Sequence, residues 1–205
     1  MQKSLTRFFF SALDALIPAR RTERLVRELS IDTLIATASP DGSLPYHNPA
    51  VRALIWELKY RGNSAAAALA GEYLSDLLLA EAAESLGTPL LVPMPMHAER
   101  RRERGYNQTE LLCESAMKYV LNSFEYVPDV LERVRNTAPQ QGLARHKRLT
   151  NVKNSMKIND PARVRGRVCI VVDDVSTTGA SFEEAKRVLL RSGAQAVHCT
   201  ALAKS

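Results

Sequence analysis

The sequence predicts an α/β protein with an open, mostly parallel sheet flanked by helices, preceded by a mainly helical N-terminal region. Three observations support this fold class. The segment Arg167–Val172 is apolar after its first residue, as expected of a strand buried on both faces. A helical pattern and then a second apolar run, Ala196–Leu202, follow it, and such alternation is typical of parallel sheets. The chain up to Ser85 instead has its apolar residues at helical spacing.

Helical periodicity predicts each element of the N-terminal part in turn. Residues 5–17 and 21–36 both have apolar positions at helical spacing. The next helix is expected to begin at Pro49, because proline is favoured in the first turn, and to end near Gly62. An alanine-rich helix is then expected over Ser64–Ser85.

The rest of the chain alternates between strand and helix patterns. Short strands are expected at Pro89–Pro93 and Asp129–Val134. Asn107–Glu110 has the form of a capping box that opens a helix. Residues 136–160 are polar and basic with weak periodicity, which predicts a long loop, and a compact domain seldom keeps such a loop unless it is functional. The last helix is expected from about Ser181 to Arg191.

Composition sets broad limits on the class of protein. The 205 residues are 45% hydrophobic and 24% charged, which is enough for one packed domain. The net charge of +6 suits a phosphate-rich ligand or nucleic acid, and equally an ordinary basic protein. The three cysteines lie far apart among apolar residues, which predicts buried free thiols in a reducing compartment. No apolar stretch is long enough to span a membrane, so a cytoplasmic protein is expected.

The segment Val171–Ser181 carries the strongest functional signal. A buried strand ends in two adjacent carboxylates, a stretch of hydroxylated residues with one glycine comes next, and then a helix begins. Ligands of open parallel sheets collect at the carboxyl ends of strands, and a helix N-terminus there offers N–H groups and a favourable dipole to a phosphate. The predicted phosphate-binding residues are Ser176, Thr177, Thr178, Gly179, Ala180 and Ser181.

The two carboxylates, Asp173 and Asp174, restrict the kind of ligand. They would repel a bound phosphate unless they face another part of the same molecule. A ribose with two vicinal hydroxyls satisfies both acids, and Mg²⁺ can share such a site, so a ligand resembling ribose 5-phosphate is expected. Neither G-x-x-x-x-G-K-[ST] nor G-x-G-x-x-G occurs in the chain. The alternative is a strand end before a helix capped by Ser181 and Glu184, with no ligand.

Several motifs resemble those of a known family. Val171–Ser181 resembles the signature with which type I phosphoribosyltransferases bind 5-phosphoribosyl-1-pyrophosphate (PRPP). Other segments, in the same order along the chain, are similar to the ComF/GntX-type branch of that family. They are Leu58–Gly62, Leu91–Pro95 followed by Arg101, Arg104–Gln108, and Thr137–Gln140 with Arg145, Arg148 and Asn151.

The resemblance implies roles for particular residues. Asp173 and Asp174 would be the catalytic acids that hold the ribose hydroxyls, and they would reach the cofactor Mg²⁺ directly, through the ribose or through water. The implied pyrophosphate-binding residues are Pro95, Met96, Arg101 and Arg104, and the implied mobile loop contains Gln140, Arg145 and Arg148. Arg100 and Arg102 fit a pyrophosphate contact and an exposed helix start equally well.

The resemblance also implies how the chain is divided. A phosphoribosyltransferase-like domain is expected over residues 46–205, after a helical extension over residues 1–45. Many ComF-like chains begin with a small cysteine-rich zinc module. This sequence has Ala19–Thr22 where paired cysteines would be expected, so it has no thiolates there to hold a structural zinc ion.

Two main functions remain open at this point. The first is an enzyme that transfers the phosphoribosyl group of PRPP to an unknown nitrogen acceptor and releases pyrophosphate. The second is a non-catalytic PRPP- or nucleotide-binding competence protein that engages single-stranded DNA or a DNA-uptake helicase. Among the basic segments only Tyr106 offers a stacking surface, which weakens the single-strand interpretation. Membrane association through Lys3–Ile17 is a third hypothesis, and an oligomer is compatible with all three.

Overall fold

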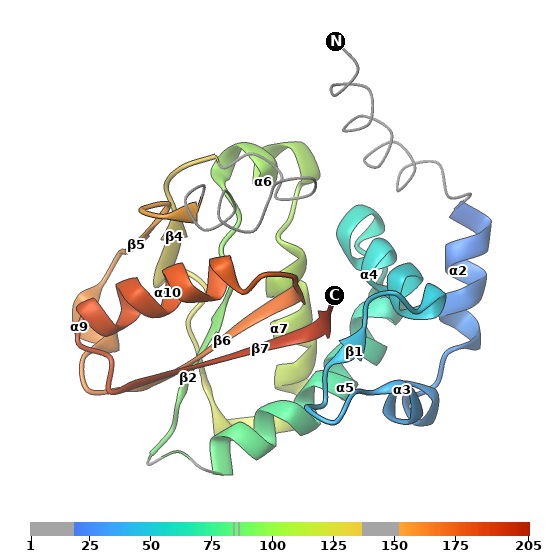
Figure 1. The fold of residues 1–205 in the computed structure, drawn as a ribbon, viewed down its shortest axis with the longest axis horizontal. Helices are drawn as coiled ribbons and strands as arrows, with labels where there is room; N and C mark the ends of the chain where they lie inside the picture. Colours follow the sequence, from blue (N-terminus) through green and yellow to red (C-terminus); the bar gives the residue numbers. More distant parts are fainter. Residues whose placement is uncertain (1–18, 84, 86, 137–151) are drawn as a thin grey trace.

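The structure is a computed structural model that describes residues 19–83, 85, 87–136 and 152–205 (Figure 1). The helix expected at residues 5–17 and the loop residues Gln140, Arg145 and Arg148 lie outside the described residues. Five parallel strands form the main sheet in the order β1-β7-β6-β2-β3. They are β1 Leu44–Pro45, β2 Leu90–Pro93, β3 Glu125–Tyr126, β6 Val168–Ser176 and β7 Ala196–Lys204. The predicted fold class is confirmed.

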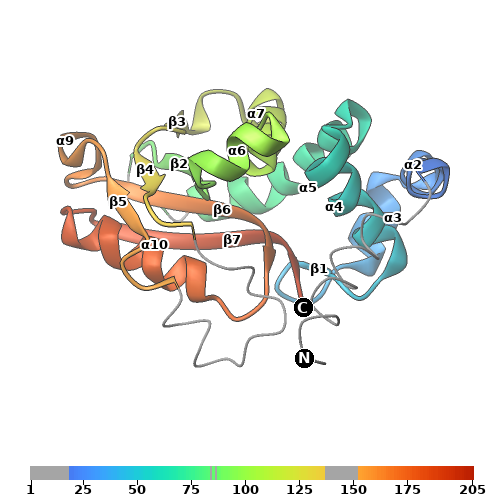
Figure 2. The same cartoon turned by 90° about the horizontal axis from the view of Figure 1, so that it is seen from above.

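Helices cover both faces of this sheet. Figure 2 shows α10 on one side and α5 and α7 on the other, with α2, α3 and α4 lying beyond α5. The longer helices are α2 Ala19–Glu28, α4 Pro49–Arg61, α5 Ser64–Ala83, α7 Gln108–Val120 and α10 Ala180–Arg191. The shorter ones are α3 Ile31–Thr37, α6 Ala98–Arg104, the 3₁₀ turn η1 Leu121–Ser123 and α9 Pro161–Val164.

A second, two-stranded sheet stands beside the main one. It consists of β4 Leu131–Arg133 and β5 Met156–Ile158, which pair antiparallel. The strand expected at Asp129–Val134 is therefore confirmed, and it belongs to this small sheet. The long loop expected at 136–160 is interrupted by β5, so that prediction is wrong for its last residues.

Local sequence signals explain where the helices begin and end. Asn48 caps α4, because its Oδ1 accepts the N–H of Ala50 at 2.8 Å. Gly62 ends the same helix in the left-handed conformation, with φ 55°. The prediction of a single helix over 21–36 is wrong, because the chain is extended at Ser30 and a new helix, α3, begins after it. Oγ of Ser30 caps this helix by accepting the N–H of Thr33.

Two hydrophobic cores lie on opposite faces of the sheet and share its central strands. Ile170 and Val172 of β6 pack into the core made with helices α2 to α5 and α7. Cys169 and Val171 of the same strand point the other way, into the core made with α10. Because side chains alternate along a strand, β6 is buried on both faces, as its apolar sequence predicted. Within the described residues, no helix is long and apolar enough to cross a membrane.

Candidate sugar-phosphate site

The acid pair lies where β6 runs past its neighbour. Strand β2 ends at Pro93, opposite Val172, and the N–H of Met94 still donates to the carbonyl of Val172 at 2.7 Å. Asp173 and Asp174 come next on β6, at the carboxyl edge of the sheet. Asp174 is only 4% exposed and Asp173 is partly buried. Oδ1 of Asp173 accepts the backbone N–H of Asp174 at 2.9 Å.

A lysine from the N-terminal helices reaches this pair. Lys59 on α4 places its Nζ 3.2 Å from Oδ2 of Asp174, and its side chain is only 23% exposed. Sequence reasoning missed this residue, although the segment Leu58–Gly62 had been singled out for its resemblance to a family. The contact joins two distant parts of the chain, so no local pattern could have predicted it.

Burial and the neighbouring charges shift the titration of the site. Burial and the charge of Asp174 raise the pKa of Asp173 to about 8, although Lys59 and the N–H of Asp174 oppose the shift. Burial by itself would lower the pKa of Lys59, but Asp174, Tyr46 and Asp173 outweigh it, and the net pKa is raised. The site therefore contains a firmly protonated ammonium group on Lys59 and a carboxyl group on Asp173 that resists ionisation.

The predicted phosphate loop follows directly on the acid pair. Gly179 has φ 75° and forms the N-cap of α10, so no side chain at that position accepts from the first-turn N–H groups. Oγ1 of Thr178 is buried and makes no hydrogen bond with the described residues. Ser176, Thr177 and Thr178 lie between the strand and the helix, and Ala180 and Ser181 are the first two helical residues.

The capping box expected from Ser181 and Glu184 is wrong. Helix α10 begins at Ala180, so Ser181 already lies within its first turn. Glu184 is 5% exposed and accepts from Nε and Nη2 of Arg187 at 2.9 and 2.8 Å. The first-turn N–H groups of α10 consequently receive no acceptor from Glu184.

Arg133, at the end of β4, links the phosphate loop to the loop after β2. Its Nε donates to the carbonyl of Pro95 at 3.2 Å and its Nη2 to Oγ of Ser181 at 3.4 Å. Burial lowers the pKa of Arg133, an effect that the nearby Asp173 opposes. The two loops that were expected to hold phosphate groups thus converge on one guanidinium group. Sequence analysis predicted Asp129–Val134 as a strand and counted Arg133 among the basic residues of segment 133–153, but it did not predict these contacts of Arg133.

The two arginines predicted to bind pyrophosphate have protein partners. Arg101 on α6 forms a two-pronged ion pair with Glu110 of α7, at 2.5 and 2.6 Å. Arg104 donates to Oε1 of Gln108, and its guanidinium lies 5.3 Å from the ring centroid of Tyr60. Pro95 and Met96 lie in the loop between β2 and α6, as expected. The structure therefore brings Pro95 to the phosphate loop and turns Arg101 towards α7.

The Arg104–Gln108 string has a structural role in connecting α4, β2 and α7. The hydroxyl of Tyr106 donates to the carbonyl of Leu58 at 3.0 Å. Nδ2 of Asn107 donates to the carbonyl of Met94 at 3.1 Å, and Oδ1 of Asn107 accepts the N–H of Thr109, which confirms the predicted cap of α7. These bonds fix the end of α4, and with it Lys59, relative to the acid pair.

The fit of the site to Mg²⁺ follows from these contacts. No group of three or more histidine, cysteine, aspartate or glutamate side chains suited to a metal is present among the described residues. Asp174 already faces the ammonium of Lys59, and Asp173 accepts a backbone N–H. Because both acids have protein partners, a Mg²⁺ ion in this site would take most of its ligands from water and phosphate oxygens, as Mg²⁺ commonly does.

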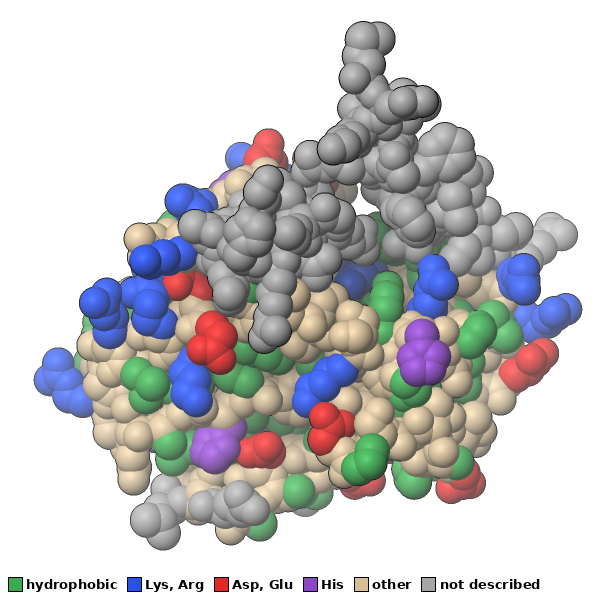
Figure 3. All heavy atoms as spheres, in the orientation of Figure 1, with side chains coloured by type: hydrophobic (Ala, Val, Ile, Leu, Met, Phe, Trp, Pro, Cys, Tyr) green, Lys and Arg blue, Asp and Glu red, His purple; other side chains and the backbone are tan. Residues whose placement is uncertain are grey.

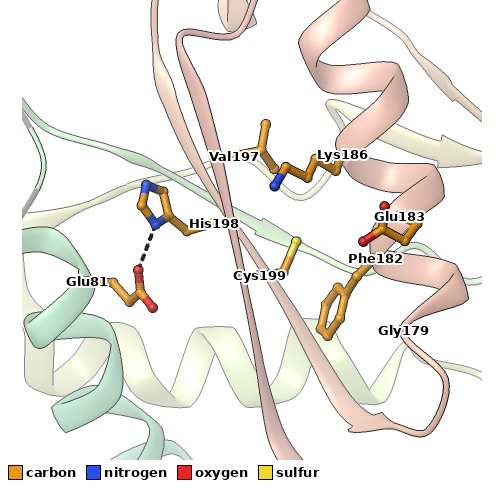
Figure 4. Close-up of a pocket in the computed structure, with 8 residues that line it drawn as sticks. All are labelled: Glu81, Gly179, Phe182, Glu183, Lys186, Val197, His198 and Cys199. Carbon is orange, nitrogen blue, oxygen red and sulfur yellow. Dashed lines mark ion pairs between the residues drawn. The ribbon is translucent and has the colours of Figure 1, made fainter. Parts of the chain in front are cut away.

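An open pocket of about 430 Å³ lies beside β7, and its lining includes Glu81 of α5, Gly179 of the phosphate loop and residues from the first turns of α10. Figure 4 shows His198 and Cys199 leaving opposite sides of β7, with His198 directed at Glu81 and Cys199 towards Phe182. Nδ1 of His198 lies 3.0 Å from Glu81. Burial raises the pKa of Cys199 to about 12, so this thiol is a poor nucleophile. The pocket contains neither carboxylate of the acid pair.

Positive charge on the surface is distributed in separate groups. On the face shown in Figure 3, lysine and arginine side chains gather mainly towards the end of the molecule that carries β4, β5 and α9, with acidic side chains between them. Two cations of these elements have acidic partners, because Lys157 of β5 pairs with Glu132 and Arg163 of α9 pairs with Asp129. Surface pairs of this kind contribute little to stability and reduce the net positive field.

Comparison with known proteins defines first the class and then the family. A model of the phosphoribosyl transferase domain matches residues 116–205, which include the acid pair and the phosphate loop. The DNA utilization protein YhgH of Salmonella typhi is 34% identical over 167 residues, covering 80% of this chain and 71% of that protein. The chain therefore belongs to the ComF-type family of phosphoribosyltransferase-like proteins, and it has no cysteine before Cys113.

Two further relatives have names connected with competence. Competence protein F of Haemophilus influenzae is 30% identical over 117 residues, which cover 56% of this chain and 50% of that protein. Competence protein ComFC of Bacillus subtilis is 34% identical over 104 residues, covering 51% of this chain and 39% of that protein. Among solved structures, a hypoxanthine phosphoribosyltransferase from Staphylococcus aureus aligns with TM-score 0.43 and 9% identity, over 68% of this chain and 63% of that one.

Proposed function

We propose that this chain binds PRPP and transfers its phosphoribosyl group to a nitrogen acceptor, with release of pyrophosphate. The observation that carries the proposal is the acid pair Asp173–Asp174, which a short hydroxyl-rich loop joins to a helix whose N-cap is Gly179. The pair can accept the two ribose hydroxyls, and the N–H groups of the loop can bind the 5′-phosphate. The buried Oγ1 of Thr178, which has no partner among the described residues, supports a ligand at this loop.

The rest of the site suits the other end of PRPP. The loop at Pro95 and Met96 converges with the phosphate loop through Arg133, which supports a pyrophosphate position between them. Bound Mg²⁺ would neutralise charge on the leaving pyrophosphate. Asp173 and Asp174 would hold the ribose in place while positive charge develops at its anomeric carbon.

The transfer itself balances without an additional reactant. The bond from the anomeric carbon to pyrophosphate breaks, and its electron pair leaves with pyrophosphate. The acceptor nitrogen forms a bond to the same carbon and loses a proton to water. The task of this chain is then to position the two reactants, which can supply a large part of a rate enhancement.

Calorimetric titration of PRPP into the protein, in the presence of Mg²⁺, tests the proposal. Replacing Asp173 and Asp174 together by asparagine should weaken binding by about 100-fold or more, because each charge-assisted hydrogen bond contributes about 1.5–3 kcal/mol. The exposed Asp76 on α5 provides the matched control, Asp76→Asn, with unchanged affinity expected. Equal affinity in the double variant and the unaltered chain would contradict the proposal.

A second candidate function is a contact with single-stranded DNA, favoured by an aromatic and arginine cluster at the end of α4. Tyr60 is 50% exposed, its ring lies 5.5 Å from that of Trp56, and Arg104 covers it. Arg61 lies 5.6 Å from the ring centroid of Trp56. Sequence analysis considered only Tyr106 here, because the fold alone brings Tyr60 and Arg104 together.

Fluorescence anisotropy with a labelled oligonucleotide tests this second function. Tyr60→Ala should weaken binding about 10-fold, since stacking on an aromatic ring contributes about 1–3 kcal/mol per base. Arg104→Ala should also make the affinity less dependent on salt concentration. Tyr119→Ala is the control, because Tyr119 is 44% exposed on α7 outside the cluster. Equal losses in the Tyr60 and Tyr119 variants would remove the support for this function.

A further inference from the structure

Lys59 presents an energetic question of its own. Its ammonium group and the carboxylate of Asp174 are 3.2 Å apart, and their side chains are 23% and 5% exposed. Removing two charges from water is costly, so a buried pair is seldom kept for stability alone. The ion pair between Lys59 and Asp174 therefore needs a role at a position that the proposed ligand must approach.

The surroundings of Lys59 hold it in place from both sides. The preceding carbonyl, of Leu58, accepts the hydroxyl of Tyr106, and the following side chain, Tyr60, lies under Arg104. Glu57, 3% exposed, accepts hydrogen bonds from Thr22 and from Asn63 at 2.5 and 3.0 Å. The backbone that carries Lys59 is therefore held by contacts on both sides, and the ammonium group meets Asp174 from this fixed segment of α4.

A polyanionic ligand cannot approach an ionised acid pair unless a cation offsets the negative charge of the pair. Carboxylate pairs in proteins commonly receive that charge from a divalent metal ion. Here an ammonium group already stands at Asp174, and Oδ1 of Asp173 is occupied by a backbone N–H. Among the described residues no third carboxylate, histidine or cysteine joins them to form a metal site.

We propose that Lys59 takes the position of a divalent cation at this acid pair, so that no metal ion bonds directly to Asp173 or Asp174. The consequence for the ligand rests on the function proposed above. It is that the sugar hydroxyls bind the acid pair without a metal ion. Any Mg²⁺ is then carried by the pyrophosphate oxygens and water. Lys59 is a positioning residue in this arrangement, because it acts through the carboxylate that it holds.

The decisive measurement uses the metal alone. Mn²⁺ is titrated into the protein and its free form is followed by electron paramagnetic resonance. The unaltered chain should show no Mn²⁺ site at the pair. Lys59→Met should bind one Mn²⁺ there, with an affinity at least about tenfold above any residual binding by the unaltered chain, because the charge of Asp174 is then uncompensated. The double variant Lys59→Met with Asp174→Asn should lose that site, and Lys59→Arg, which keeps the charge, should not gain it.

Controls separate this effect from general changes in charge or folding. Lys157→Met removes a lysine from an exposed pair with Glu132 and should leave Mn²⁺ binding unchanged. Lys59→Gln repeats the test if the methionine variant does not give a folded circular dichroism spectrum. Equal Mn²⁺ binding by the unaltered chain and the Lys59 variants, or a site in the unaltered chain that Asp174→Asn removes, would overturn the assignment.

A second experiment tests how Lys59 affects binding of the ligand. Ribose 5-phosphate, which has no pyrophosphate, is titrated in the presence of EDTA. The unaltered chain should bind it, and Lys59→Met should bind it at least about tenfold more weakly, with Mn²⁺ restoring part of the affinity. Failure of the unaltered chain to bind either this sugar phosphate or PRPP would overturn the proposed function. The Mn²⁺ arm would still decide the role of Lys59, because it uses no sugar.

Discussion

Asp173→Asn is expected to make the protein more stable at pH 8, although it removes an acid of the proposed site. The pKa of Asp173 is raised from 3.8 to about 8, mainly by burial and then by Asp174. Between these two pH values the folded protein keeps a proton that the unfolded chain releases. The free energy of unfolding therefore falls as the pH rises through this window, and asparagine removes that loss.

Thermal unfolding in EDTA at pH 5 and at pH 8 measures the effect. We expect the melting temperature of Asp173→Asn to exceed that of the unaltered chain by about 4 °C at pH 8, from a gain of about 1.5 kcal/mol. The difference should shrink towards pH 5, where the aspartate is protonated in the folded state. The exposed Asp76→Asn should show no such trend. A difference that is the same at both pH values would mean that Asp173 does not titrate in this window.

Glu184→Ala is expected to cause the largest loss of stability. Burial would raise the pKa of Glu184, but the hydrogen bonds from Arg187 and from the backbone N–H groups of Met156 and Asn154 lower it below its ordinary value. This carboxylate therefore joins α10 to the segment that leads into β5. Removing it leaves buried donors unsatisfied, and we expect a loss of about 3 kcal/mol.

Chemical denaturation measures that loss, and hydrogen exchange locates it. The N–H groups of Asn154 and Met156 should exchange faster in Glu184→Ala, because they lose their acceptor. Glu183→Ala is a close control, since Glu183 is the preceding residue and is exposed. It should change stability by no more than about 0.5 kcal/mol. A similar loss in both variants would show that Glu184 is no more than a surface charge.

Hydrophobic periodicity was sufficient to predict the elements with a strong pattern. Strands β2, β6 and β7 and helices α4, α5, α7 and α10 lie close to the residues expected. Helix α6 was missed because its residues Ala98–Arg104 are nearly all charged and show no apolar stripe. Strands β1 and β3 have only two residues each, too few for any periodic signal.

The site could be predicted only where its residues are neighbours in the sequence. Asp173, Asp174 and Gly179 were found because a strand end, two acids and a glycine lie within seven consecutive residues. The contacts of Lys59 with Asp174 and of Arg133 with Ser181 were not found, since each residue meets its partner only after the chain has folded. The prediction for Ser181 and Glu184 failed because the helix begins before Ser181, and Glu184 is turned to Arg187.

The sharing of β6 by both cores has a consequence for how this protein denatures. The N-terminal helices pack on one side of that strand and α10 on the other, through alternate residues such as Ile170 and Val171. Unfolding of either layer would expose the apolar side chains on one face of β6 to water. Both layers should therefore unfold in a single cooperative transition. We therefore expect that cutting off α2 and α3, which contribute Val26 and Leu34, destabilises the sheet as a whole, with no independently folded half left behind.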